Sequence, residues 1–258
     1  MSSHPLVKKS TPPILSIRAR ANKFKQWKRR FKVIKNSIFD LALKRFVFQK
    51  VTELVRDNPR LQTPSVFYDW LHKAYAIDMT IHIRRLTDTD KRSISFVNLM
   101  KDIERYPEVM SRRRFTLPYK GFMKQFGHKD FDRLAKPGSS VLNKRLIAQH
   151  KAKLVKSHKR LRSFTNKHVA HLDIRGMRRF PTYEELNACV DTIESLLKDY
   201  ALLLEQSAPD PVVPVIQYDW MAPFRLAWLP NKKTHESATT LLPGQDKLSP
   251  SASIPPAS

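Results

Sequence analysis

Residues 182–206 read TYEELNACVDTIESLLKDYALLLEQ, and this stretch indicates the fold class more clearly than any other. Its apolar residues recur at intervals of three or four, which places them on one face of an α-helix. They are Leu186, Cys189, Ile193, Leu197, Tyr200 and Leu204. Thr182 and Glu185 have the spacing of a capping box, so the helix should begin directly after Pro181. The stretch predicts a helix with one face against a core.

Helical spacing also appears upstream. Helices are predicted over residues 22–57, 65–86 and 95–105, and from about Ser139 to a far limit marked by Asp173 and Gly176. Residues 65–86 are apolar nearly all round, which is typical of a central, buried helix. Residues 107–138 do not fit any single element. With only 5 glycines against 48 lysines and arginines, the composition favours helices over strands and tight turns. We therefore expect an all-α bundle of four to five main helices.

The ends of the chain differ from this helical part. Residues 1–20 contain three prolines and no periodicity, so we expect a flexible basic arm before a helical domain at 21–206. Residues 207–230 include QYDWMAPFRLAWLP (217–230), an aromatic segment expected to dock on the domain or on a second subunit. Residues 231–258 are rich in Ser, Thr and Pro and are expected to be disordered.

Composition also limits location. The longest apolar runs have about four residues, far short of the roughly 20 that span a bilayer, and the first residues show no secretory signal. The single cysteine, Cys189, excludes an internal disulfide and a zinc site built from several cysteines. We therefore expect a cytoplasmic protein with no membrane segment, cofactor or metal.

The net charge of +25 is unevenly distributed. From Ala208 onward four basic residues balance four acidic ones, whereas residues 109–168 hold seventeen basic residues against Asp130 and Asp132. This excess favours a polyanionic partner, with nucleic acid ahead of an anionic membrane surface. The remaining alternative is a generically basic, solvated protein. Candidate RNA contacts are Arg112, Arg113, Arg114, Lys151, Lys156, Lys159 and Arg160.

Residues 163–173, SFTNKHVAHLD, place two histidines at the end of a packing stripe on the basic helix. The stripe comprises Ile147, His150, Leu154, Ser157, Leu161, Phe164, His168 and His171. Three interpretations fit the two terminal histidines. They pack in the core, they share a metal for which Asp173 is the only nearby additional ligand, or one of them transfers protons at neutral pH.

Two segments carry a resemblance to a known family. NKHVAHLD (166–173) and IHIRRLTDTDKRSISFVNLMKDI (81–103) resemble the HEPN superfamily, in particular its AbiU-type branch of phage abortive-infection proteins. The helix at 182–206 is similar to the closing helix of that branch, and the resemblance covers residues 24–206. It implies an up-and-down bundle that is commonly dimeric. It also implies antiphage defence, an antitoxin or other protein partner, and in many members metal-independent cleavage of RNA.

The resemblance assigns roles residue by residue. His171 matches the catalytic histidine, Asn166 matches the polar residue of the motif, and Lys167 matches a common filler. The position of the motif arginine falls on Thr165, which cannot make a bidentate phosphate contact. Arg162, three residues earlier on nearly the same face, or Lys167 would then supply the cation that cleavage requires.

Asp78, His82 and Arg85 form a second polar set, on one line of the helix at 65–86. One interpretation is a buried ion pair that fixes helix register. The other is that Arg85 and Asp88 line the cleft of His171 and orient it. Together with the resemblance, the sequence predicts an RNA-targeting defence protein, and the leading hypothesis for its activity is an endoribonuclease. The alternatives are an inactive RNA- or protein-binding module, and a scaffold whose charge is incidental.

Overall fold

The structure is a computed structural model that describes residues 15–164 and 181–226, without the side chains of Arg160, Arg162 and Ser163. The chain divides into two units, Met1–Pro214 and Val215–Ser258. The described part is helical and contains no β-strand, only two isolated bridges, Ser111 to Val141 and Ala135 to Leu142. The expected all-α class is confirmed.

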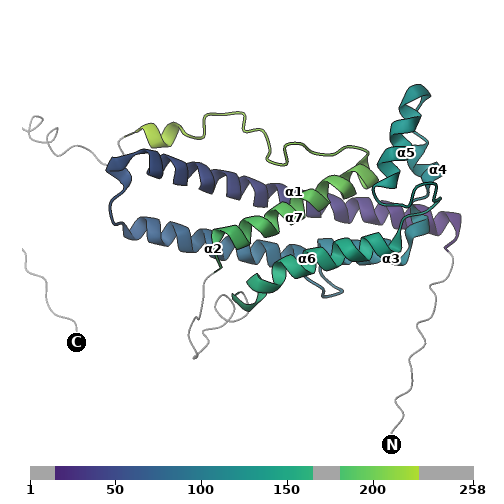
Figure 1. Ribbon diagram of the computed structural model, residues 1–258, viewed down its shortest axis with the longest axis horizontal. Coiled ribbons are helices and arrows are strands. Elements are labelled where there is room, and N and C mark those ends of the chain that lie inside the picture. The colour runs from purple at the N-terminus through teal and green to yellow at the C-terminus, as the bar shows by residue number, and fades with distance from the viewer. Residues whose placement is uncertain (1–14, 165–180, 227–258) are drawn as a thin grey trace, which may run out of the picture. The chain divides into compact units, whose positions relative to one another are not determined.

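The first unit holds seven α-helices among its described residues. They are α1 (Ile17–Asp57), α2 (Val66–Thr87), α3 (Phe96–Arg105), α4 (Arg112–Thr116), α5 (Lys124–Asp132), α6 (Lys144–Phe164) and α7 (Tyr183–Glu205). Short 3-10 turns lie at Pro59–Leu61, Pro107–Val109 and Gly121–Met123. α1 and α2 run antiparallel, α6 and α7 pack against them, and α3 continues from α2 onto α6 (Figure 1). The result is an up-and-down bundle.

The core forms where the apolar faces of these helices meet. All six residues of the predicted α7 face are buried, from Leu186 to Leu204. On α1 the buried residues are Trp27, Phe31, Ile34, Ile38, Leu41 and Ala42. On α6 the stripe residues Ile147, Leu154, Leu161 and Phe164 are buried. The three-four spacing therefore predicted the correct inward faces.

Local capping residues set the helix ends. Ser16 accepts a hydrogen bond from the Ala19 backbone N–H at 3.2 Å, so α1 begins at Ile17, inside the segment expected to be a flexible arm. Asn143 Oδ1 accepts from the N–H groups of Arg145 and Leu146, so α6 begins at Lys144 rather than near Ser139. The predicted capping box of Thr182 and Glu185 is present at the start of α7. The far limit expected for α6, at Asp173 and Gly176, lies outside the described residues.

The prediction that the whole second helix is buried was wrong. In the first half of α2, Val66 is 86%, Phe67 50% and Trp70 60% exposed, and burial begins at Ala76. The reason is the lack of neighbours: the buried residues of α1 end at Ala42, so the outer part of the α1–α2 hairpin is packed on one side only. An apolar pattern all round a helix shows which residues are apolar, but it cannot show how many helices surround them.

Residues 107–138 form α4 and α5 with two 3-10 turns, consistent with the absence of one clear element in the sequence. In the second unit the structure describes residues 215–226, where Asp219 pairs with Arg225 across a short 3-10 turn at Ala222–Arg225. Residues 227–230, with Trp228, lie outside the described residues, so docking of the aromatic segment stays a prediction. None of the helices in the described part is long and apolar enough to cross a membrane.

Candidate functional site

The motif NKHVAHLD (166–173), which carries the resemblance to the HEPN superfamily, lies in a part of the chain that the structure does not describe. Thr165, Asn166, Lys167, His168 and His171 lie outside the described residues. Arg162 belongs to α6, but its side chain lies outside the description as well. The described residues nearest to the motif in the chain are those at the end of α6, which packs against α2, α3 and α7.

A buried hydrogen bond joins α6 to the end of α2. Thr87, the threonine of the RLTD stretch, lies 3.0 Å from Nδ1 of His158, and both side chains are buried. The Thr87 hydroxyl already donates to the Ile83 carbonyl at 2.9 Å, so we assign the proton of this pair to His158 Nδ1. The RLTD stretch and the helix before NKHVAHLD, which the sequence linked only by resemblance, are therefore in direct contact.

Arg85 and Asp88 do not make this contact. Arg85 is exposed and has no acidic partner among the described residues. Asp88 shapes the loop that follows α2: its carboxylate accepts from the Asp90 N–H at 3.0 Å and its carbonyl accepts from the Ser95 hydroxyl. α6 runs antiparallel to α2, so beyond His158 it leads away from Asp88 (Figure 1). Their proposed role in orienting His171 stays a prediction.

Asp78 and His82 belong to a polar cluster between α1 and α2. Lys44 of α1 pairs with Asp78 at 2.9 Å and with Asp40 at 3.1 Å. His82 Nε2 lies 2.7 Å from Ser37 Oγ, and its Nδ1 lies 3.5 Å from Lys44 Nζ. The expected ion pair within one helix is therefore replaced by a network across two helices. Arg85 is not a member, and Asp78 is half exposed.

The order Ser37, His82, Asp40 resembles a hydrolytic triad, but the geometry does not support one. His82 Nδ1 is 3.6 Å from Asp40, beyond a hydrogen bond, and the Lys44 ammonium competes for the same nitrogen. Ser37 sits inside α1, where backbone N–H groups are committed to the helix and cannot form an oxyanion hole. Burial lowers the pKa of His82, and the charge of Lys44 lowers it further. The cluster therefore holds a neutral histidine that fixes the α1–α2 register.

The three consecutive arginines at 112–114 have three different environments. Arg112 is largely enclosed: it donates to the carbonyls of Ser139 and His128, pairs with Asp132, and lies over the Phe131 ring. It therefore holds α4 and α5 together. Arg113 is exposed, and Arg114 stacks on Phe24 of α1. Of the three, only Arg113 is fully available to a ligand at the surface.

The basic residues of α6 present a clearer surface. The helix contains eight basic residues and no acidic one. Lys151 is held by Glu104 of α3. Lys153, Lys156 and Lys159 are exposed and have no acidic partner in the part of the chain that the structure describes. The side chain of Arg160, the remaining candidate contact, lies outside the description.

A second basic surface, on α1, was missed by the sequence analysis. Residues 17–39 contain no acidic residue, and Lys25, Lys28, Arg29 and Lys32 are exposed at helical spacing along this half of the helix. We call these four residues the α1 ridge. The sequence signal for it is the absence of acidic residues before Asp40, which is less conspicuous than the larger basic excess at 109–168. Among the described residues, no group of three or more His, Cys, Asp or Glu side chains is placed to hold a metal ion.

Comparison with known proteins places this architecture in a family. No curated protein and no solved structure matches the chain significantly. The profile of the AbiU2 family of HEPN proteins matches residues 24–221, which takes in all seven α-helices except the first turns of α1. The match includes both segments that carried the resemblance. The chain therefore belongs to the AbiU2 family of HEPN proteins.

Proposed function

We propose that this protein is an RNA-targeting component of a bacterial abortive-infection system. The observation that carries the proposal is the acid-free helix α6, whose exposed Lys153, Lys156 and Lys159 lead directly into the NKHVAHLD motif. Lysines without acidic partners attract a phosphate backbone, and a charge excess of this size favours a polyanion over a neutral partner. Family membership supports the defence role.

The proposed chemistry is metal-independent cleavage of RNA. A ribose 2′-hydroxyl attacks the adjacent phosphorus, and the bond to the 5′-oxygen of the next nucleotide breaks, which leaves a 2′,3′-cyclic phosphate and a free 5′-hydroxyl. His171 takes the proton of the attacking hydroxyl or gives one to the leaving oxygen, and Asn166 positions the phosphate. Arg162 or Lys167 stabilises the charge of the pentavalent phosphorus in place of the missing motif arginine. A second candidate function follows from Thr165 itself: without a cation at that position the same surface would bind RNA, or a protein partner such as an antitoxin, and not cleave it.

Cleavage is tested with the purified full chain and mixed RNA in EDTA. Specific cleavage that is lost in His171→Ala and retained in His168→Ala supports the enzyme, because the two variants remove the same side chain three residues apart. Intact RNA in the presence of the wild-type chain would reject catalysis and leave the binding function.

Binding is tested by the dependence of RNA affinity on salt. Each neutralised phosphate of a single strand contributes about −0.7 to the slope of log K against log salt. The triple variant Lys153→Gln, Lys156→Gln, Lys159→Gln should therefore flatten the slope by about 2. The matched control removes three charges elsewhere, at Lys50, Arg56 and Lys91, and should leave the slope nearly unchanged. A slope near zero for the wild-type chain would favour the scaffold.

We further propose that the chain forms a homodimer through the exposed apolar face of α2. Val66, Phe67 and Trp70 lie close together there, and isologous dimers bury such a patch against its own copy. Trp70→Ser should weaken self-association at least about tenfold in sedimentation velocity. Ile94→Ser, which changes another half-exposed apolar residue, is the control. A wild-type chain that is monomeric at high concentration would contradict the dimer.

A further inference from the structure

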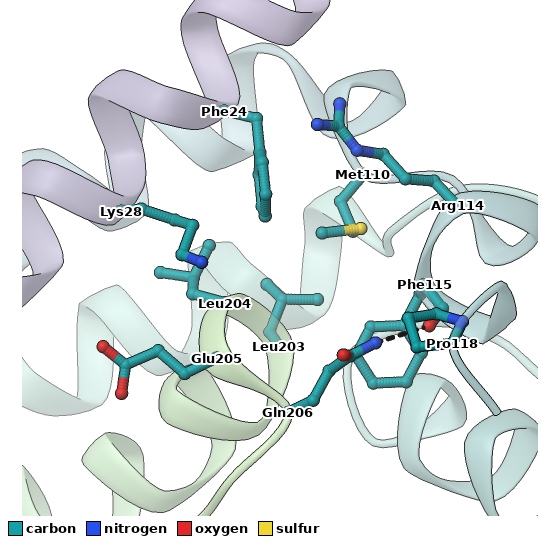
Figure 2. Close-up of a pocket in the computed structure, with 10 residues that line it drawn as sticks. All are labelled: Phe24, Lys28, Met110, Arg114, Phe115, Pro118, Leu203, Leu204, Glu205 and Gln206. Carbon is teal, nitrogen blue, oxygen red and sulfur yellow. Dashed lines mark hydrogen bonds between the residues drawn. The ribbon is translucent and has the colours of Figure 1, made fainter.

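A small pocket lies where the beginning of α1, the α4 segment and the end of α7 meet (Figure 2). Its volume is about 160 Å³. Six of its ten lining residues are apolar, and the other four are two basic residues, one acid and one amide. The lining residues are Phe24, Lys28, Met110, Arg114, Phe115, Pro118, Leu203, Leu204, Glu205 and Gln206.

Two cations meet at one aromatic ring of this pocket. The Arg114 guanidinium lies 4.2 Å from the centre of the Phe24 ring, and the Lys28 ammonium lies 6.0 Å from the same centre. Figure 2 shows the ring between these two side chains. The Arg114 guanidinium donates a weak hydrogen bond to the Val109 carbonyl at 3.4 Å. Among the described residues, neither cation has a carboxylate partner.

The acid of the pocket does not compensate these charges. Glu205 pairs with Lys35 at 2.5 Å, and in Figure 2 its carboxylate points away from Arg114. Partial burial costs the Arg114 guanidinium hydration and lowers its pKa. A cation that has lost hydration and has no counter-ion is an unfavourable arrangement on its own. An anion bound at the rim of the pocket, beside Arg114 and Lys28, would remove that cost.

The walls define what else the ligand must carry. Phe24, Met110 and Phe115 offer flat or adaptable apolar surfaces, on which a planar ring stacks. Gln206 donates its amide N–H to the Phe115 carbonyl at 2.8 Å, which leaves its oxygen turned into the pocket as an acceptor (Figure 2). Pockets for drug-sized ligands have roughly 300–1,000 Å³, so this one takes a single ring system, and the rest of a ligand has to lie at its rim.

We propose that this pocket binds one nucleoside monophosphate unit. The base lies against the apolar wall of the pocket with an N–H directed to the Gln206 oxygen, and the phosphate lies at the rim, beside the two cations that flank Phe24. Lys28 also belongs to the α1 ridge, so a longer strand would continue past it along Lys25, Arg29 and Lys32. The same chemistry fits a free nucleotide and one residue of an RNA strand. The second source rests on the proposed function.

The binding test uses isothermal titration of the full chain with AMP, adenosine and inorganic phosphate at one salt concentration. AMP should bind more tightly than either of its parts, because the pocket recognises both ring and phosphate. Arg114→Gln should weaken AMP binding about tenfold. Arg113→Gln removes the same charge from the neighbouring exposed residue and should leave AMP binding unchanged.

Other outcomes overturn the proposal. These are equal losses in Arg113→Gln and Arg114→Gln, phosphate binding as tight as AMP binding, or no AMP binding at millimolar concentration. Lys28 is exposed on α1, so Lys28→Gln tests the site even if Arg114→Gln fails to fold. Lys28→Gln should weaken AMP binding, whereas Lys32→Gln, on the same ridge, should leave AMP binding unchanged. An unchanged affinity in Lys28→Gln would remove the phosphate from the position assigned to it.

A competition experiment separates the two sources. If AMP displaces a labelled single-stranded RNA, the pocket holds a residue of the strand. If AMP binds and RNA binds independently of it, the pocket takes free nucleotides. The triple lysine variant of α6 should lose RNA affinity and keep AMP affinity. RNA binding without AMP binding would therefore reject the nucleotide pocket and leave the proposed function in place. AMP binding without RNA binding would support the pocket and reject the proposed RNA-targeting function.

Discussion

Asp102 gathers three donors from the beginning of α1. It accepts from the Trp27 indole at 2.8 Å and pairs with Lys23 at 3.2 Å and Arg30 at 3.5 Å. Its side chain is only 17% exposed, so its removal leaves two cations and a buried indole N–H without their acceptor. Asp102→Ala should lower the free energy of unfolding by roughly 2–4 kcal/mol.

Urea denaturation followed by circular dichroism measures that change. The control is Asp57→Ala, which loses only an exposed pair with Arg56 and should stay within about 0.5 kcal/mol of the wild-type chain. Similar losses in the two variants would show that Asp102 contributes no more than an ordinary surface ion pair.

His82 makes stability depend on pH. Its folded pKa lies below the ordinary value of 6.5 because burial and Lys44 disfavour the imidazolium, while Asp40 and Asp78 oppose this more weakly and Arg85 adds to it. The unfolded chain therefore binds the proton first as pH falls. The contribution of His82 is fully present above pH 6.5 and decreases below it.

The melting temperature should thus fall between pH 7 and pH 5, and His82→Gln should flatten that decline because glutamine keeps a hydrogen bond and cannot ionise. His150, whose pKa is also lowered by burial, accounts for a remaining part. A decline as steep in His82→Gln as in the wild-type chain would assign the pH dependence to other groups.

Whether the role of a single residue can be predicted from the sequence depends on how far away its hydrogen-bond partner lies in the chain. Thr182 was recognised as a helix start because a cap bonds within three residues of itself. The partners of Asp78 and His82 were not, because Lys44 and Ser37 lie on another helix. His158 was overlooked for the same reason, since Thr87 is 71 residues away in the chain.

At the scale of elements, α7 is the helix whose boundaries depend most clearly on local sequence. Its capping box satisfies the Glu185 N–H through the Thr182 hydroxyl, and the Glu185 side chain accepts from Thr182 in return. Thr182→Ala should therefore destabilise the fold by about 1 kcal/mol in thermal or urea unfolding.

Thr192→Ala provides the comparison within the same helix. The Thr192 hydroxyl bonds back to the Ala188 carbonyl in mid-helix, where alanine has the higher helix propensity, so this change should be neutral or slightly stabilising. An equal loss in both variants would mean that the cap adds nothing beyond what any threonine in α7 contributes.

Helix existence was easier to predict than helix surroundings. Periodicity correctly located α2, α3 and α7 to within a residue or two. It could not show that Trp70 is exposed while Met79 is buried, because that difference depends on where neighbouring helices end. The α1 ridge and the Phe24 pocket were missed for a related reason: the pocket joins residues from three segments that are far apart in sequence.

At the scale of the whole molecule, a net charge of +25 should make the folded state sensitive to ionic strength. Like charges repel more strongly in the compact chain than in the unfolded one, and salt screens that repulsion. The melting temperature should rise between about 20 and 200 mM NaCl, where the Debye length falls from roughly 20 Å to 7 Å. A lower melting temperature in salt would mean that the ion pairs, such as those of Asp102, outweigh the repulsion.

The length of α1 restricts how this family can vary. Its 41 residues form one uninterrupted rod of about 60 Å that carries Phe24 near one end and Lys44 and Phe48 towards the other. Deleting one residue between them would turn everything downstream by about 100°, whereas deleting seven would turn it by only about 20°. Relatives that keep the contacts at both ends of α1 should therefore differ in the length of this helix by seven residues or a multiple of seven. Single insertions should collect in the connections at 58–65 and 88–95, where no helical phase has to be preserved.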